Sequence, residues 1–171
     1  GKIIGSLDTE INAPQAPIQK EGKYYLTTVE VSDAAYSDTQ VGELRSVNFA
    51  LLDPIITLKI CGGTDTSKLY FAVCDAATGK ELAKIGSQEN RYIFKDVTFD
   101  VTGKVPMGTE VFFKIVDASS SGWGFLAVDD IKFTGHVIED PIVDITYDFE
   151  SGKLEPWRMV SGNLERVIGY R

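Results

Sequence analysis

The sequence predicts an all-β protein, a β-sandwich of the jelly-roll type. Short runs rich in β-branched and aromatic residues recur along the chain, and turns rich in glycine separate them. No segment shows a sustained helical period of apolar residues. The 171 residues suffice for one domain with a sizeable core.

The first half of the chain predicts a series of short strands. Residues 1–23 are weakly patterned, with a short strand expected at 2–4 and a long loop over the rest. The next strands are expected at residues 23–31, 43–51, 55–61 and 69–75. Apolar and polar residues alternate along 55–61 (IITLKIC), which is typical of a strand with one face in the core.

The second half predicts further strands at residues 81–85, 92–101, 110–117 and 126–133. The apolar positions of the last run change phase at Asp129-Asp130. Two adjacent carboxylates inside an apolar strand are costly unless something compensates them. The phase change therefore predicts a β-bulge or a bound cation at this point.

The turn before that strand, Gly122-Trp123-Gly124, places an indole between two flexible residues. Loop aromatics can pack on the edge of a sandwich or contact a ligand, and the sequence leaves both interpretations open for Trp123.

Composition excludes some partners. The formal net charge is −8, so nucleic acid is not expected to bind, because phosphate binding requires a basic face. No apolar run is long enough to span a bilayer. Because the sequence begins at Gly1, the lack of a signal peptide says nothing about the compartment.

The two cysteines, Cys61 and Cys74, lie at the ends of runs that could form a hairpin about residues 62–68. In such a hairpin Cys61 would lie near the turn and Cys74 farther from it, so they would not face each other. Two reduced, half-buried thiols are expected rather than a disulfide.

Catalysis is not expected. The chain has one histidine, His136, and no Gly-x-Ser-x-Gly nucleophile motif, phosphate-binding loop or zinc-ligand spacing. Glycoside hydrolysis needs two carboxylates across a cleft, which sequence cannot place.

Several short motifs, in order, resemble the non-catalytic β-sandwich modules attached to fructan-degrading glycoside hydrolases (levanases, inulinases) and to other bacterial surface enzymes. The resemblance covers residues 22–135 and implies the galactose-binding-like jelly-roll fold. One departure is Phe125, where family members often carry histidine after Gly-Trp-Gly. The motifs are Gly22-Lys23-Tyr24-Tyr25-Leu26, Gly42-Glu43-Leu44-Arg45-Ser46, Cys61-Gly62-Gly63, Phe71-Ala72-Val73-Cys74, Ile115-Val116-Asp117, Gly122-Trp123-Gly124 and Val128-Asp129-Asp130-Ile131.

The resemblance implies an extracellular, secreted or surface-attached bacterial module that binds a polysaccharide or oligosaccharide, with fructan (levan or inulin) expected first. Such a module would target a glycoside hydrolase among the neighbouring domains of a multimodular protein. Arg45 matches a family position but lies in a predicted strand. The expected loop contacts to sugar are Trp123, Asp117, Asp65, Asn90 and Arg91. The alternative is a structural or adhesive spacer, or a protein-interaction module, without a sugar site.

The opening strand of the family is missing at the N-terminus and its motif occurs instead from Asp148-Phe149-Glu150 through Asn163. We therefore expect a sandwich module at 1–137, a linker at 138–146, and a segment at 147–171 that completes this sandwich or that of a strand-swapped copy. The segment could also be the start of a next module. The resemblance further implies a structural calcium ion on Glu150 and Asp130, with Asp129 as the less certain ligand.

Overall fold

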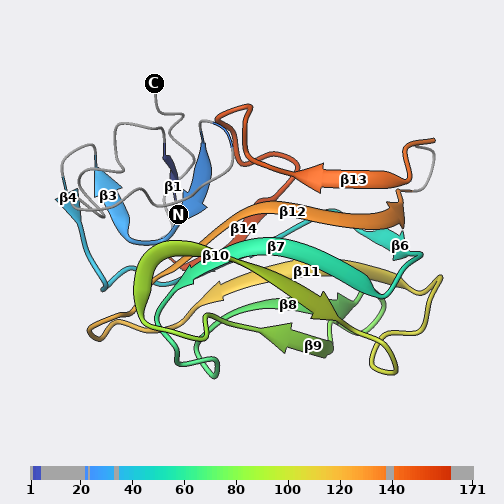
Figure 1. The fold of residues 1–171 in the computed structure, drawn as a ribbon, viewed down its shortest axis with the longest axis horizontal. Coiled ribbons are helices and arrows are strands. Elements are labelled where there is room, and N and C mark those ends of the chain that lie inside the picture. Colours follow the sequence, from blue (N-terminus) through green and yellow to red (C-terminus); the bar gives the residue numbers. More distant parts are fainter. Residues whose placement is uncertain (1, 5–21, 23, 33–34, 138–140, 163–171) are drawn as a thin grey trace.

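The computed structural model describes residues 2–4, 22, 24–32, 35–137 and 141–162. Every regular element in this part of the chain is a β-strand, and all strand pairs are antiparallel, so the predicted all-β class is confirmed (Figure 1). The long loop expected between residue 4 and residue 22 lies outside the described residues. The strands are β1 (Lys2–Ile4), β2 (Tyr25–Thr27), β3 (Glu30–Ser32), β4 (Ala35–Tyr36), β5 (Gly42–Arg45), β6 (Phe49–Leu51), β7 (Ile55–Gly62), β8 (Leu69–Asp75), β9 (Glu81–Ile85), β10 (Arg91–Asp100), β11 (Glu110–Asp117), β12 (Leu126–His136), β13 (Asp144–Tyr147) and β14 (Arg158–Gly162).

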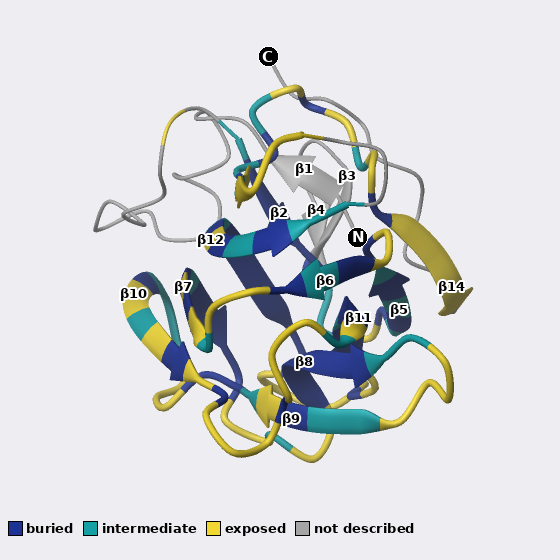
Figure 2. Ribbon diagram, turned by 90° about the vertical axis from the view of Figure 1, so that its right-hand side faces the viewer, coloured by how far each residue is buried: buried dark blue, intermediate teal, exposed yellow. Residues whose placement is uncertain are grey.

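The strands form two layers around one core. In the first layer β12 pairs with β7 along one edge and with β2 and β13, at different residues, along the other. β10 pairs with the far edge of β7. In the second layer the order is β9, β8, β11, β5 and β14. β6 connects the layers because it pairs with both β11 and β12. Figure 2 shows the buried residues gathered where the two layers face each other.

Aromatic rings fill the centre of the core. Phe113 of β11 packs against Phe49 and Phe71 at centroid distances of 4.8 and 4.9 Å, and against Phe133 of β12 at 4.7 Å. These rings come from the inward-facing positions of both layers, as period-two alternation requires.

Two predicted strands are divided in the structure. The run 23–31 becomes β2 and β3, and the run 43–51 becomes β5 and β6. At the second break the side chain of Ser46 takes part in the pairing, because its Oγ accepts a hydrogen bond from the Phe113 backbone N–H at 2.8 Å. Side-chain hydroxyls compete with ladder hydrogen bonds in this way and interrupt regular strands.

The expected hairpin between residues 55–61 and 69–75 does not form. β7 pairs with β10 and β12, whereas β8 pairs with β9 and β11, so the turn between them carries the chain from one layer to the other. Cys61 and Cys74 are both free, as expected, although for a different geometric reason, and both are buried rather than half-buried.

The bulge predicted at Asp129-Asp130 is present. The register of β12 on β7 shifts between Asp129 and Lys132, and Asp130 has a positive φ of 48°. A bulge inserts an extra residue into the ladder and changes the phase of the side chains, which explains the broken alternation in the sequence.

The C-terminal segment packs on both layers. β13 pairs with β12, while β14 pairs with β5 in the other layer, so the chain between them crosses the sandwich (Figure 1). Three aromatic side chains of this segment, Tyr147, Phe149 and Trp157, join the main core. β13 begins at Asp144, inside the range expected to be a linker. Asn163 and the residues after it lie outside the described part, and the division into modules stays a prediction.

Candidate ligand site at the loop end of the sandwich

Three loops meet where β7, β9 and β11 end. The backbone N–H of Gly63 donates to the Phe125 carbonyl oxygen at 3.0 Å, which joins the β7–β8 turn to the β11–β12 loop. The Thr64 N–H donates to Oδ1 of Asn90 at 3.0 Å, which joins the same turn to the β9–β10 loop. These contacts bring residues far apart in sequence to one end of the molecule.

The glycines of the β7–β8 turn are needed for this contact. A Cβ atom on Gly62 would lie 2.2 Å from the Phe125 carbonyl oxygen, and one on Gly63 would lie 2.0 Å from the Trp123 carbonyl oxygen. Both distances are far inside van der Waals contact. The turns that contain the motifs Cys61-Gly62-Gly63 and Gly122-Trp123-Gly124 therefore pack against each other backbone to backbone.

Trp123 is held in a fixed conformation and remains partly exposed. Its φ is 62°, an uncommon value for a residue with a side chain, and its backbone N–H donates to Oδ2 of Asp38 at 3.0 Å. Its ring lies 5.1 Å from the ring of Tyr92 and 6.1 Å from that of Phe125. The residue keeps 37% of its surface exposed. An aromatic residue that packs against neighbouring rings and stays partly exposed is suited to stacking on a flat apolar face of a ligand.

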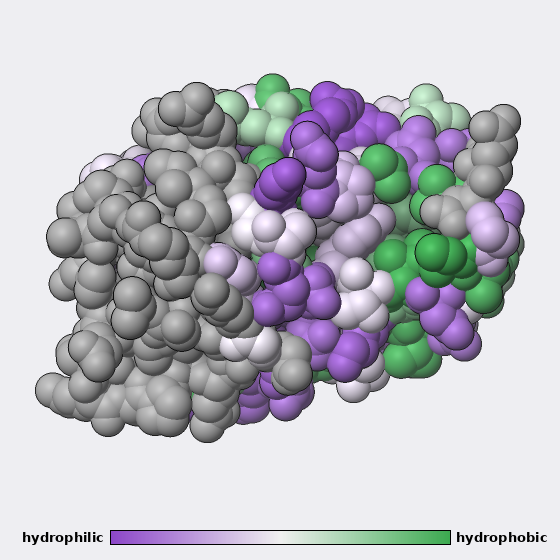
Figure 3. Space-filling view, turned by 90° about the horizontal axis from the view of Figure 1, so that it is seen from above, coloured by the Kyte–Doolittle hydropathy of each residue, from purple (hydrophilic) through white to green (hydrophobic). Residues whose placement is uncertain are grey.

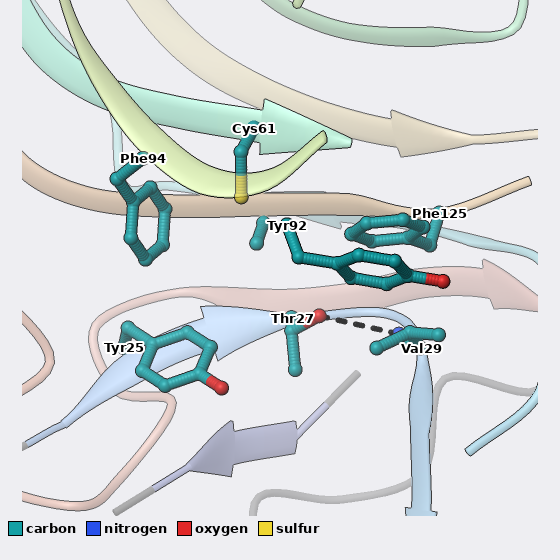
Figure 4. A pocket seen from close by; sticks show the side chains of 8 residues that line it. Tyr25, Thr27, Val29, Cys61, Tyr92, Phe94 and Phe125 are labelled. Carbon is teal, nitrogen blue, oxygen red and sulfur yellow. Dashed lines mark hydrogen bonds between the residues drawn. The ribbon is translucent and has the colours of Figure 1, made fainter. Parts of the chain in front are cut away.

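The stack has an aromatic pocket beneath it. Tyr92 and Phe125 lie face to face, 5.0 Å apart at 13°, and Figure 4 shows them with Cys61, Phe94 and Tyr25 around the pocket. The pocket holds about 10 Å³, room for about one water molecule. A ligand larger than water would therefore contact the exposed part of Trp123 rather than enter this pocket.

Of the polar residues predicted to bind ligand, Asn90, Arg91 and Asp65 belong to the loops that meet here. Asn90 is exposed and uses Oδ1 to cap the β7–β8 turn. Arg91 pairs with Glu89 at 2.6 Å, and its Nε is buried without a hydrogen-bond partner in the part of the chain that the structure describes. Asp65 is exposed and accepts hydrogen bonds from the N–H and hydroxyl of Ser67, which hold the pKa of its carboxyl below the ordinary value.

The other two predicted contacts are not exposed on this surface. Asp117 is 1% exposed and accepts hydrogen bonds from the Thr28 hydroxyl and the Ser119 N–H. Burial raises the pKa of Asp117 to about 7. Arg45 is paired opposite Lys114, in the middle of β11, and its guanidinium lies 3.6 Å from the centre of the Phe112 ring. Its geometry is that of a strand residue covering an aromatic neighbour.

The three predicted calcium ligands have protein partners. Oδ1 of the fully buried Asp129 accepts from the Asp130 N–H at 2.8 Å, and Oε1 of Glu150 accepts from the Tyr24 N–H at 2.7 Å. Asp130 forms an ion pair with Lys132 at 3.1 Å. Across the described residues, no three or more acidic, histidine or cysteine side chains gather in a metal-binding group. These three side chains alone do not fill a calcium shell of six to eight oxygens, so backbone carbonyls and loop oxygens would have to complete it, and calcium stays a prediction.

Sequence reasoning missed two residues of the site. Tyr92 forms the centre of the aromatic stack, and Asp38 fixes the backbone of Trp123. The run 92–101 alternates well, which concealed a register shift between Arg91 and Lys95 that re-aims the start of β10. Asp38 is 85 residues from Trp123 in sequence, so no local pattern could have connected them.

No family model and no curated protein matches the chain. Among solved structures, the C-terminal extracellular domain of EmbC from Mycobacterium tuberculosis is similar, with a TM-score of 0.43 and 12% sequence identity. The match covers 74% of this chain and 44% of that one, so the chain spans less than half of that domain's length. A likeness of this size supports no functional argument, and the fold assignment rests on the strands described above.

The described residues contain no helix long and apolar enough to cross a membrane.

Proposed function

We propose that this chain is a non-catalytic carbohydrate-binding module of a secreted or cell-surface bacterial protein. One observation supports this function most strongly: Trp123 is half-exposed, fixed by Asp38, and backed by Tyr92 at the loop end of the sandwich. Sugars are bound by an aromatic platform with a few planar polar groups beside it. Asn90 and Arg91 directly precede Tyr92 in the sequence. Fructan, levan or inulin, is the first ligand to test, on the sequence resemblance.

The module would tether a catalytic neighbour, a glycoside hydrolase, to its polysaccharide. A single shallow platform binds weakly, so useful retention on a polymer would come from several modules or several sites acting together. A structural calcium ion at Glu150, Asp130 and Asp129 belongs to the same proposal and would act on the fold rather than on the sugar.

The proposal is tested by isothermal titration with levan, inulin and unrelated polysaccharides, first with calcium and then with a chelator. Heat with a fructan that Trp123→Ala abolishes and Met107→Ala preserves supports the site. Met107 is a suitable control because it is exposed and lies in the turn before β11, at the opposite end of that strand from Trp123. Binding that survives Trp123→Ala overturns the assignment of this site.

A second candidate function, a spacer or protein-interaction module, is favoured by a different surface. Leu52 and Val143 flank the last part of β12, since the Leu52 N–H donates to the Thr134 carbonyl oxygen and the Gly135 N–H to that of Val143. Both side chains are exposed, as is that of Ile142. Figure 3 shows hydrophobic residues gathered at one end of the upper face. If no glycan gives a heat of binding while calcium still raises the melting temperature, this second function is favoured.

A further inference from the structure

The loop that carries Trp123 is tied at both of its ends to one buried carboxyl group, that of Asp117. At the start of the loop, the Ser119 N–H donates to Oδ1 of Asp117 at 3.1 Å. At its end, the Leu126 N–H donates to the Thr28 hydroxyl oxygen at 2.9 Å, and that hydroxyl donates to Oδ2 of Asp117 at 2.5 Å. One carboxyl therefore joins the two ends of the loop between β11 and β12.

This carboxyl has almost no contact with water. Asp117 is 1% exposed, and its partners Thr28 and Ser119 are buried with it. Burial disfavours the charged form of a carboxyl, because the charge loses its hydration. The two hydrogen bonds act in the opposite direction, yet burial is the larger effect and raises the pKa of Asp117 to about 7. The group therefore titrates where ordinary aspartates are fully ionised.

A neighbouring negative charge adds to the cost of ionising Asp117. Asp38, in the loop between β4 and β5, raises the pKa of Asp117, and its Oδ2 is also the acceptor of the Trp123 N–H. The amino group of the chain acts the other way and lowers this pKa. Among the other elements beside Asp117, β5 contributes Glu43, which forms an ion pair with a lysine of β11, and the β7–β8 turn contributes the exposed Lys68. Ionised Asp117 therefore repels the carboxylate that fixes the Trp123 backbone.

Protonation of Asp117 leaves both of its contacts in place. A neutral carboxyl keeps a carbonyl oxygen that accepts from the Ser119 N–H, and its hydroxyl shares a hydrogen bond with the Thr28 oxygen. Ionisation keeps the same contacts but adds a buried charge and the repulsion from Asp38. Both costs are relieved when the loop opens and water reaches the carboxylate. The neutral form therefore favours the closed loop, and the ionised form shifts the balance towards an open one.

We propose that Asp117 is a pH-sensitive latch of the loop at residues 118–125: the neutral carboxyl holds the loop closed, and the ionised carboxyl favours its opening. The pKa is about 7 in the closed loop and about 4, the ordinary value, in an open and hydrated one. The contribution of the latch is complete below about pH 4 and declines until about pH 7. Trp123 is then held most firmly in acid. That the latch regulates sugar binding rests on the proposed function, whereas the response of the loop to pH does not.

Hydrogen exchange of backbone amides tests the latch in the whole chain. The amides of Trp123 and Leu126 report the loop, and that of Phe113, which is bonded to Ser46 Oγ in the other layer, reports global unfolding. Observed rates divided by the intrinsic rate at each pH give the opening constant. For the loop this constant should increase on the order of 100-fold from pH 5 to pH 8 and level off above about pH 7. The loop amides should exchange faster than the Phe113 amide, because the opening is local.

Two variants separate this carboxyl from other causes of a pH response. Asp117→Asn keeps the shape of the side chain and is neutral at every pH, so the opening constant of its loop should not change with pH. Asp100→Asn is the matched control, because Asp100 is exposed at the end of β10 and should leave the wild-type profile unchanged. If Asp117→Asn does not fold, the carbon-13 shift of the Asp117 carboxyl in the wild type gives its titration midpoint, which should fall near pH 7.

Each outcome decides the proposal. A loop profile that is flat from pH 5 to pH 8, that persists in Asp117→Asn, or that merges with the Phe113 amide overturns the latch. A carboxyl carbon that titrates near pH 4 overturns it as well. The proposed function is tested separately, because affinity changes only by the fraction of loop that is open. Levan or inulin bound at Trp123 should slow the exchange of the loop amides at every pH. If the polysaccharides do not slow it and the pH profile is as expected, the latch stands and the proposed function is wrong.

Discussion

The hydroxyl of Thr28 donates a hydrogen bond of 2.5 Å to the carboxylate of Asp117, 89 residues away in sequence. The same Thr28 oxygen accepts from the backbone N–H of Leu126 at 2.9 Å. This buried chain of hydrogen bonds connects the loop after β2 to β11 and β12 just behind the Trp123 loop. The loop end of the sandwich is therefore held in part by hydrogen bonds to a titratable group, the carboxyl of Asp117.

The first prediction concerns the pH dependence of this support. Burial raises the pKa of Asp117 to about 7, so the folded state binds a proton that the unfolded state releases near pH 4. This group therefore contributes stability below about pH 4, and the contribution declines as pH rises to about 7. Relative to Asp117→Asn, the wild type should lose up to about 4 kcal/mol of unfolding free energy over that interval. Urea unfolding of both proteins across pH 4 to 8 measures this, and parallel pH profiles would contradict it.

The second prediction concerns the backbone contact between the two glycine-containing turns. Gly63→Ala should destabilise the protein by about 2 kcal/mol, because its Cβ would lie 2.0 Å from the Trp123 carbonyl oxygen. Gly122→Ala in the neighbouring turn is the control, since nothing lies within 4 Å of its Cβ position. Denaturant melts report stability, and tryptophan emission, to which Trp123 and Trp157 both contribute, reports the surroundings of the indoles. Equal unfolding free energies for the two variants would show that the backbone adjusts to the added Cβ without loss of stability, which would contradict the prediction.

The third prediction concerns the C-terminal segment. Phe149 lies in the main core, so Phe149→Ala should cost about 3–5 kcal/mol of unfolding free energy. Met159→Ala, at an exposed position of β14, should change it by less than about 0.5 kcal/mol. Chemical unfolding of the two variants measures both effects. If Phe149→Ala unfolds like the wild type, the segment does not belong to this cooperative core.

The fourth prediction concerns the thiols. Burial raises the pKa of Cys74 to about 11 and raises that of Cys61 as well. The thiolate is the reactive form, so a disulfide reagent should modify Cys74 in the native protein at least about 100-fold more slowly than an exposed thiol. Reaction of both thiols should accompany global unfolding in urea. A cysteine that reacts fast under native conditions would contradict its burial.

Local pattern determined the strands. The alternation of residues 55–61 and the apolar run 110–117 match β7 and β11, because a strand with one buried face repeats every two residues. The phase change at Asp129-Asp130 predicted a bulge or a bound cation, and the register of β12 on β7 does shift there. In the segment that was expected to complete this sandwich or that of a copy, Phe149 and Trp157 are buried.

Only the tertiary structure decided which strands pair and which loops meet. β7 and β8 are neighbours in sequence but lie in opposite layers, since the pairing partner of a strand depends on distant segments competing for the same edge. The loop residues Trp123, Asn90 and Asp38 come together only after both layers form, whereas Arg45 and Asp117 point elsewhere. The sequence by itself determined the strand content and the apolar face of each strand, because these depend on short-range periodicity. The geometry of the site depends on long-range packing, which no local pattern records.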